Sequence, residues 1–354
     1  MRAGTIVKAI PVACLLLTAM AHSQEQSKEQ LNGPPDLATL RRLRAIEANE
    51  KVSAPFASRE TPAPAWVLNT NYRSGTYGID LSHWETKPCT FDSAHLQRLP
   101  SYGLRFVYLE TTRGTKVYTS VGKVWTLLAP LHASKTLFRG AYHFLMPLNP
   151  DGTGDAASQA NAFLKSVGAG GSDKLAALAP VLDIESTHTP ITQGTDAYNN
   201  CKRREQDSDT KAYYCDRWSE MTKQKIVALA QAWIAAVEPV TKQKVTLYTN
   251  DGWWNDDNIM GTSGMPLSSG RPIWIANYPT SGMPQYDNAA NLPPLPNNVT
   301  YPNPYNKPSF WQFTQSGSLS SDPFSCSSDD PQGSLDFSYV PLPEAQFEAV
   351  FGVQ

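Results

Sequence analysis

The chain has 354 residues and a formal net charge of −2, with 41% hydrophobic and 18% charged residues. This near-neutral balance gives no electrostatic case for binding to nucleic acid. Beyond the first 23 residues, no stretch approaches the roughly 20 consecutive apolar residues that a membrane-spanning helix needs, so no membrane span is predicted.

The first 23 residues have the pattern of a secretory signal peptide. Arg2 and Lys8 precede an apolar stretch over residues 9–20, and small residues around Ala21 and Ser23 mark a cleavage site. Loss of Arg2 and Lys8 with the signal reduces the 30 basic residues to 28, against 32 acidic ones, a net charge of −4. We therefore predict an exported protein, periplasmic or extracellular.

Residues 24–70 are rich in Gln, Glu, Ala and Pro, and a short helix is indicated over 36–51. This composition offers little apolar area to bury, so the segment is predicted to be a polar N-terminal arm rather than a domain. The remainder, residues 71–354, suits one barrel domain better than two domains.

Short apolar strands alternate with helices through this remainder. The clearest helices are 222–237, where Pro239 is expected to stop the helix, and 155–167. Eight segments are predicted to be strands: 77–80, 105–109, 138–144, 180–183, 245–248, 273–276, 309–313 and 335–337.

The alternation predicts an α/β fold with a largely parallel sheet, closed into a single irregular TIM-like β/α barrel. After Tyr248, loops rather than helices separate the strands, so the last part of the barrel is expected to be helix-poor. Ligands of such barrels gather at the carboxyl ends of the strands. The polar stretches 187–220 and 278–307 follow strand ends and are expected to border that end.

Four cysteines remain after export, and an even number in an oxidising compartment suggests two disulfides. We predict Cys89–Cys326, because the first and last strands of a closed barrel are neighbours, and Cys201–Cys215, which closes a short insertion. With neither a C-x-x-C pair nor a His-rich cluster, no metal site and no cofactor are expected.

The segment 179–186 carries two carboxylates, Asp183 and Glu185, two residues apart on a buried strand. Alternation puts both on one face, with Cβ atoms roughly 7 Å apart. Such acids are costly to bury unless they face a cleft or pair with Arg or a helix end. An isolated pair would favour the structural role, but further acids, Asp80 and Asp336, lie at other strand ends.

Aromatic and amide side chains accompany the acids at the strand ends. Sugar rings stack on aromatic faces, and amides and carboxylates bind hydroxyl groups, so this rim suits a polysaccharide. The candidate substrate-binding residues are Tyr142, His143, Tyr248, Trp274, Asn277, Tyr278 and Gln312.

Six segments, in order, resemble the motifs of family 25 glycoside hydrolases, the Chalaropsis-type lysozymes: 77–84 (Tyr-Gly-Ile-Asp-Leu-Ser-His-Trp), 140–144, 180–185, 274–278, 310–313 and 335–337. The resemblance implies cleavage of the β-1,4 bond between N-acetylmuramic acid and N-acetylglucosamine in peptidoglycan, with retention of configuration. It implies that Glu185 is the general acid, Asp183 its partner, and Asp80 and Asp336 two further acids. Peptidoglycan glycan strands are the expected partner of a monomeric enzyme.

Three positions depart from the family pattern. Glu85 stands where the family usually has Gln, and the run Glu110-Thr-Thr-Arg-Gly114 replaces a Lys-Ala-Thr-Glu-Gly-like run. Position 110 is therefore reversed in charge, and Arg113 replaces an acid, which suggests a compensating exchange.

Two other functions remain open at this stage. One is a chitinase-like N-acetylhexosaminidase, because aromatic rims and D-x-E pairs recur in such barrels. The other is a non-catalytic glycan-binding module, which the presence of all four acids argues against. The residues do not choose between substrate-assisted catalysis and a covalent aspartyl intermediate.

Overall fold

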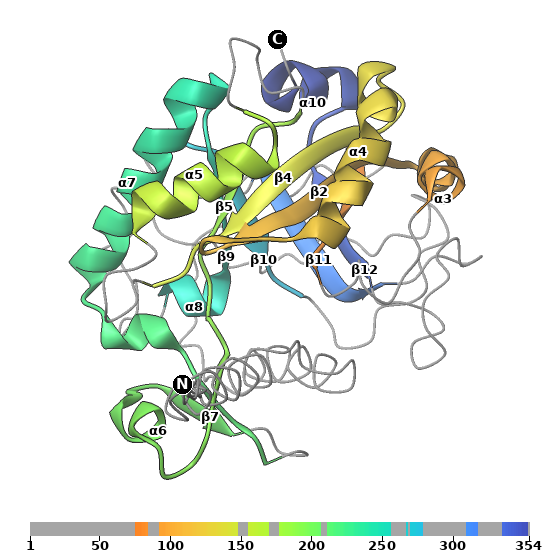
Figure 1. Ribbon diagram of the computed structural model, residues 1–354. Helices are drawn as coiled ribbons and strands as arrows, with labels where there is room; N and C mark the ends of the chain where they lie inside the picture. Colours follow the sequence, from red (N-terminus) through yellow and green to blue (C-terminus); the bar gives the residue numbers. More distant parts are fainter. Residues whose placement is uncertain are drawn as a thin grey trace, which may run out of the picture. The chain divides into compact units, whose positions relative to one another are not determined.

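A computed structural model describes residues 75–83, 92–147, 155–169, 177–206, 211–255, 267, 270–278, 309–317 and 335–352, all of them in one compact unit (Figure 1). The predicted signal peptide, the polar arm and the proposed Cys89–Cys326 bond lie outside these ranges. Among the described residues, no helix is both long and apolar enough to cross a membrane.

Eight strands form a closed barrel, and all eight coincide with segments predicted to be strands. Around the barrel they follow the order β1, β12, β11, β10, β9, β5, β4, β2, and pairing of β1 with β2 closes the ring. Their bounds are β1 (Thr76–Leu81), β2 (Leu104–Arg113), β4 (Phe138–Phe144), β5 (Val181–Asp183), β9 (Thr246–Asn250), β10 (Ile273–Ala276), β11 (Phe310–Gly317) and β12 (Leu335–Val340). A two-residue strand, β3 (Lys116–Val117), extends β2.

The barrel is largely parallel, as the alternation of strands and helices predicts. The exception is β12, which runs antiparallel to both of its neighbours, β1 and β11. The predicted single β/α barrel is therefore confirmed, with one reversed strand, β12, between β1 and β11.

Residue alternation divides the strand side chains into two buried layers. The outward set, such as Val107 and Leu182, belongs to the hydrophobic cluster beneath the helices, whereas Phe106, Tyr108 and Trp274 pack inside the barrel. Glycine makes room for these rings. A Cβ added to Gly78 would lie 2.2 Å from the ring of Phe106, and one added to Gly140 would lie 2.2 Å from the ring of Tyr108.

Helices α4, α5 and α7 cover the outside of β2, β4 and β5 (Figure 1). Outside the polar stretch 187–220, the described helical segments include α3 (Ser93–Arg98), η2 (Leu99–Tyr102), α4 (Thr119–Ala133), α5 (Ala156–Ser166), α7 (Lys223–Thr241), α8 (Asp251–Asn255) and α10 (Glu344–Phe351). Asp155 caps α5 by accepting a hydrogen bond from the Ser158 backbone N–H at 2.7 Å, and Thr222 caps α7.

The predicted stop of α7 at Pro239 is wrong by about one turn. Pro239 lies inside the last turn, and the helix continues to Thr241 before Lys242 adopts a left-handed conformation with φ of 59°. A proline this close to the end removes only one backbone hydrogen bond, which the packing of the buried Val237 and Thr241 offsets.

The C-terminal helix α10 closes the end of the barrel opposite the carboxyl ends of the parallel strands. Phe347 and Phe351 join the interior cluster with Phe106, Phe138 and Phe310, which lie near the amino ends of their strands. The Ala179 backbone N–H, just before β5, donates to the Phe351 carbonyl at 2.9 Å. Any ligand of the barrel must therefore approach from the other end.

The polar stretch after β5 forms a small sheet of its own. It contains β6 (Thr189–Ile191), α6 (Asp196–Asn200), β7 (Arg204–Gln206), β8 (Tyr213–Cys215) and η3 (Arg217–Glu220), with strand order β6-β8-β7. The predicted Cys201–Cys215 disulfide is present, with Cα atoms 5.9 Å apart. The connection from β9 to β10 was expected to lack a helix but begins with the short helix at residues 251–255. The connections between β10, β11 and β12 fall almost entirely outside the described residues, so their expected lack of helices stays a prediction.

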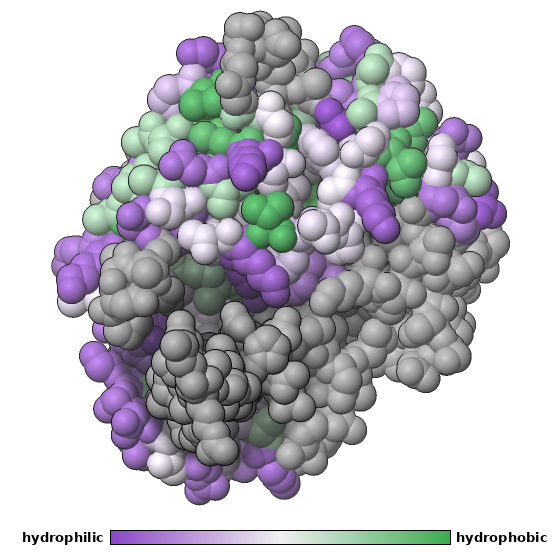
Figure 2. Space-filling model, in the orientation of Figure 1, coloured by the Kyte–Doolittle hydropathy of each residue, from purple (hydrophilic) through white to green (hydrophobic). Residues whose placement is uncertain are grey.

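The face drawn in Figure 2 mixes hydrophilic and hydrophobic residues over the outer helices. Large hydrophobic side chains that are well exposed among the described residues are Val117, Val240 and Val350. They lie on three different elements, β3, α7 and α10.

Candidate active site

The inward positions near the carboxyl ends of the parallel strands carry polar rather than apolar side chains. In the β1–β12 pair, Asp80 lies directly opposite Asp336, and in the β5–β9 pair Asp183 lies opposite Tyr248. Directly opposed residues of this kind bring their Cβ atoms within about 5 Å of each other. Strand register thus brings Asp80 and Asp336, which are 256 residues apart in the sequence, together at one end of the barrel.

Gln312 on β11 links two of the acids with two tyrosines. Its Nε2 donates to both carboxyl oxygens of Asp80 at 3.0 Å and to Oδ2 of Asp336 at 3.5 Å. Its Oε1 accepts hydrogen bonds from the hydroxyls of Tyr248 at 2.8 Å and Tyr278 at 2.6 Å. One buried amide therefore sets the orientation of four side chains, a more specific role than the sugar contact expected for it.

Asp183 and Glu185 differ in their surroundings. Asp183, at the end of β5, is 4% exposed, and its Oδ1 has no hydrogen-bond partner among the described residues, whereas Glu185 is half-buried. Burial, and next the charge of Glu185, raises the pKa of Asp183 well above its ordinary range, while the charge of Arg113 opposes the shift. Burial therefore favours the protonated form of Asp183.

Glu110 and Arg113, the two residues expected to have exchanged charges relative to the family motif, form an ion pair beside Asp183. Glu110 Oε1 accepts a hydrogen bond from Arg113 Nε at 2.8 Å, and the Arg113 guanidinium lies 3.8 Å from the centre of the Phe144 ring. The register of β2 against β4 shifts between Glu110 and Thr112, so Thr111 is an extra residue in the strand. This bulge brings Arg113 to the same side of the strand as Glu110. The compensating exchange suggested by the sequence is therefore a direct contact.

His83 completes this network from the end of β1. Its Nδ1 lies 2.6 Å from Glu110 Oε2, its backbone N–H donates to the same oxygen at 3.2 Å, and its ring stacks on Tyr118 at 3.8 Å. Burial lowers the pKa of His83 despite the nearby charge of Glu110. A neutral His83 that carries its proton on Nδ1 fits this geometry, with Glu110 ionised between His83 and Arg113.

Two of the expected substrate-binding residues do not join the acids. His143 faces the helices, where its Nδ1 lies 2.7 Å from Thr112 Oγ1 and its ring stacks on Trp233. Trp274 is buried in the barrel interior, stacked on Phe310. Strand alternation explains both placements: His143 follows the inward-facing Tyr142, and Trp274 lies one inward position deeper than Ala276.

The other expected residues lie near the acids. Tyr142 is half-buried on the inner face of β4, and burial, then the charges of Glu110 and Asp80, raises its pKa well above the ordinary value. Asn277 follows β10, where its backbone N–H donates to the Gln312 carbonyl at 3.1 Å and its carbonyl accepts from Trp311 Nε1 at 2.8 Å.

Sequence reasoning missed the parts played by His83 and Trp218. His83 stands in the first motif but attracted no role because its partner, Glu110, is 27 residues away. Trp218 is fully buried although it belongs to a polar insertion, and its Nε1 donates to the Glu185 carbonyl at 2.8 Å. A lone tryptophan three residues after Cys215 was the one available signal.

Across the described ranges, no group of three or more His, Cys, Asp or Glu side chains is arranged to hold a metal ion.

Four carboxyl groups around the carboxyl ends of a β/α barrel, with tyrosines between them, make up a site typical of glycoside hydrolases. Comparison with known proteins agrees with this class. The model of glycosyl hydrolases family 25 matches residues 79–322, and the chain belongs to this family.

A curated relative is Lysozyme M1 of Streptomyces globisporus, which is 27% identical over 245 residues, covering 69% of this chain and 63% of the relative. The chain thus aligns with somewhat less than two thirds of that protein. The crystal structure of a lysozyme from Streptomyces coelicolor matches with a TM-score of 0.51 at 21% identity, over 79% of this chain and 98% of that one. A muramidase structure from Acremonium alcalophilum gives a TM-score of 0.49 at 20% identity, over 78% and 98%. The Streptomyces coelicolor likeness bears on the fold alone.

Proposed function

We propose that the protein is an exported lysozyme that hydrolyses the β-1,4 bond between N-acetylmuramic acid and N-acetylglucosamine in peptidoglycan. The observation that carries this proposal is that Asp80, Asp183, Glu185 and Asp336 lie close together at the carboxyl end of a family 25 barrel. The lysozyme named among its relatives supports the choice of substrate.

In this proposal Glu185 donates a proton to the glycosidic oxygen as the bond breaks. Glu185 lies just past the end of β5 and is half-buried, so it can contact a substrate more easily than the buried Asp183 can. The neighbouring Asp183 favours its protonated form through burial, and a sugar that covers Glu185 would desolvate that carboxyl as well, which favours its protonated form in the complex.

The remaining acids stabilise the positive charge that develops on the sugar ring. Asp80 and Asp336 are held by the Gln312 amide and therefore present fixed carboxylates, without reorganisation during the reaction. We propose retention of configuration, with Asp183 or Asp336 orienting the acetamido group of the substrate.

The proposal is tested by the reducing-end sugar released from purified peptidoglycan. A muramidase leaves N-acetylmuramic acid at the new reducing end, identified by borohydride reduction and mass spectrometry. N-acetylglucosamine at that end, or cleavage of chitin in preference to peptidoglycan, would instead support an N-acetylhexosaminidase. Binding to insoluble peptidoglycan without any release of reducing ends would indicate a glycan-binding module.

A further inference from the structure

The backbone that carries Glu185 is held by the small sheet inserted after β5. Trp218, in η3 of this insertion, is fully buried, and its Nε1 donates to the Glu185 carbonyl oxygen at 2.8 Å. Two residues further on, Thr187 Oγ1 donates to the Cys215 carbonyl at 3.1 Å and accepts from the Arg217 backbone N–H at 2.9 Å. The segment from Glu185 to Thr187 is therefore fixed at both ends by the insertion.

The insertion is in turn attached to the barrel through Asp216, which is 2% exposed. Its Oδ1 accepts from the Trp218 backbone N–H at 3.2 Å, and its Oδ2 accepts from Trp253 Nε1 at 2.9 Å. Trp253 lies on α8, directly after β9, and β9 pairs with β5. Thus a continuous chain of hydrogen bonds joins the strand next to β5 with the backbone of Glu185.

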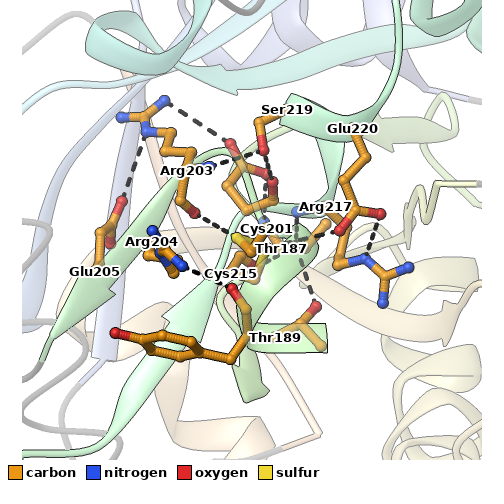
Figure 3. Close-up of a disulfide and its surroundings, with 12 residues drawn as sticks. Thr187, Thr189, Cys201, Arg203, Arg204, Glu205, Cys215, Arg217, Ser219 and Glu220 are labelled. Carbon is orange, nitrogen blue, oxygen red and sulfur yellow. Dashed lines mark hydrogen bonds and ion pairs between the residues drawn. A yellow bond between two sulfur atoms is a disulfide. The ribbon is translucent and has the colours of Figure 1, made fainter. Parts of the chain in front are cut away.

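The disulfide closes the insertion around the same contacts. Cys215 is the last residue of β8, where it pairs with Thr189 on one side and Arg204 on the other, and its carbonyl is the group that Thr187 binds. Figure 3 shows Thr187, Cys215, Arg217 and Ser219 gathered at the Cys201–Cys215 bond. Cutting this bond would remove the covalent link between Cys201 and β8, the strand that holds the Glu185 segment.

We propose that the disulfide-closed insertion holds Glu185 in position for proton donation, with Trp218 as the positioning residue. This inference rests on the proposed function, in which Glu185 is the general acid. Misplacement of a catalytic group by about 1 Å can cost on the order of 100-fold in rate. A misplaced Glu185 should therefore slow the steps in which this residue donates a proton.

The test compares Trp218→Phe with Trp233→Phe in the full-length protein. Both tryptophans are fully buried and lose the same atoms, but Trp233 Nε1 has no hydrogen-bond partner among the described residues and Trp233 lies in the helix layer. Each variant is assayed on peptidoglycan and on the 2,4-dinitrophenyl β-glycoside of its disaccharide. The dinitrophenolate leaving group departs without protonation, so its release does not depend on a general acid.

We expect Trp218→Phe to lower kcat on peptidoglycan by about 10- to 100-fold with little change in KM. It should retain most of its kcat/KM on the dinitrophenyl substrate, because kcat/KM does not include the later step in which a retaining enzyme uses the same carboxyl as a base. Trp233→Phe should affect both substrates equally, through stability alone. The inference is overturned if Trp218→Phe matches Trp233→Phe, or if it loses activity on both substrates to the same extent. A Glu185→Gln variant separates the two proposals, because full activity of that variant overturns the assignment of Glu185 as the general acid, on which this inference rests.

A second variant covers the case in which Trp218→Phe does not fold. Cys201→Ser combined with Cys215→Ser leaves Trp218 intact and opens the insertion. We expect the same selective loss on peptidoglycan, with the barrel intact by circular dichroism. A folded double variant that turns over both substrates at the wild-type rate would overturn the inference.

Discussion

Glu110 and Arg113 form an ion pair, with Arg113 Nε and Glu110 Oε1 2.8 Å apart, at the two positions where the sequence motifs led us to expect a compensating exchange of charge. Burial alone would raise the pKa of Glu110, but the charge of Arg113 and the hydrogen bonds from His83 and Arg113 override it and lower the pKa from its ordinary 4.5 to about 2. The exchange thus keeps one acid and one base in contact beside Asp183.

This pair predicts a pH-dependent contribution to stability. Because the pKa of Glu110 is lower in the folded state, its stabilising effect is complete above about pH 4.5 and is lost as the pH falls towards about 2. We expect Glu110→Gln to cost about 3 kcal/mol near neutral pH, since Arg113 and His83 lose a buried partner. Urea unfolding of both proteins should show this gap at neutral pH and a much smaller one near pH 3. A gap of the same size at both pH values would refute the assignment.

The contribution of Asp183 to stability should depend on pH in the opposite direction. Its raised pKa means that the folded state favours the protonated carboxyl, so this group contributes stability at low pH and the contribution is lost as the pH rises through the raised pKa. Asp183→Asn should therefore raise Tm by about 2–4 °C at neutral pH, leave it nearly unchanged in acid, and impair turnover. Asp92→Asn, an exposed helix cap that asparagine can also supply, is the control and should shift Tm little. An unchanged or lower Tm for Asp183→Asn at neutral pH would contradict this account.

Substitution of Gln312 tests whether the arrangement of Asp80 and Asp336 depends on the amide that binds both acids. Gln312→Glu keeps an acceptor for Tyr248 and Tyr278 but replaces the donor to Asp80 and Asp336 with a third acid. We expect kcat to fall by about 100-fold near neutral pH, with partial recovery in acid, because repulsion raises the pKa values of the group. The same change at the exposed Gln97 should leave the rate unaffected. Wild-type turnover by a folded Gln312→Glu protein would show that this amide does not organise the site.

The barrel could be predicted from the sequence because its signals are local. Alternation of apolar strands and helices identified every barrel strand, and the inward acids Asp80, Asp183 and Asp336 follow from position relative to strand ends. His143 and Trp274 were also predicted to line the rim, because they too lie near strand ends. Which face a strand residue occupies depends on register, however, and these two turn to the helix layer and the deep interior.

The contacts that depend on distant segments lay beyond reach of the sequence. Nothing local to Trp218 indicates a hydrogen bond to Glu185, 33 residues away, and the Thr111 bulge that brings Arg113 to Glu110 leaves no mark in hydrophobic periodicity. The charge exchange at these positions could be noticed, but only the three-dimensional structure shows it as a contact.

The central claim is that Glu185 is the general acid, and its most direct test is the rate at which Glu185→Gln releases reducing ends from peptidoglycan. The amide keeps the size and hydrogen bonding of the side chain but has no proton to donate. We predict a fall of about two to four orders of magnitude in kcat, while binding to insoluble peptidoglycan survives. Release of reducing ends by Glu185→Gln at close to the wild-type rate would contradict the account.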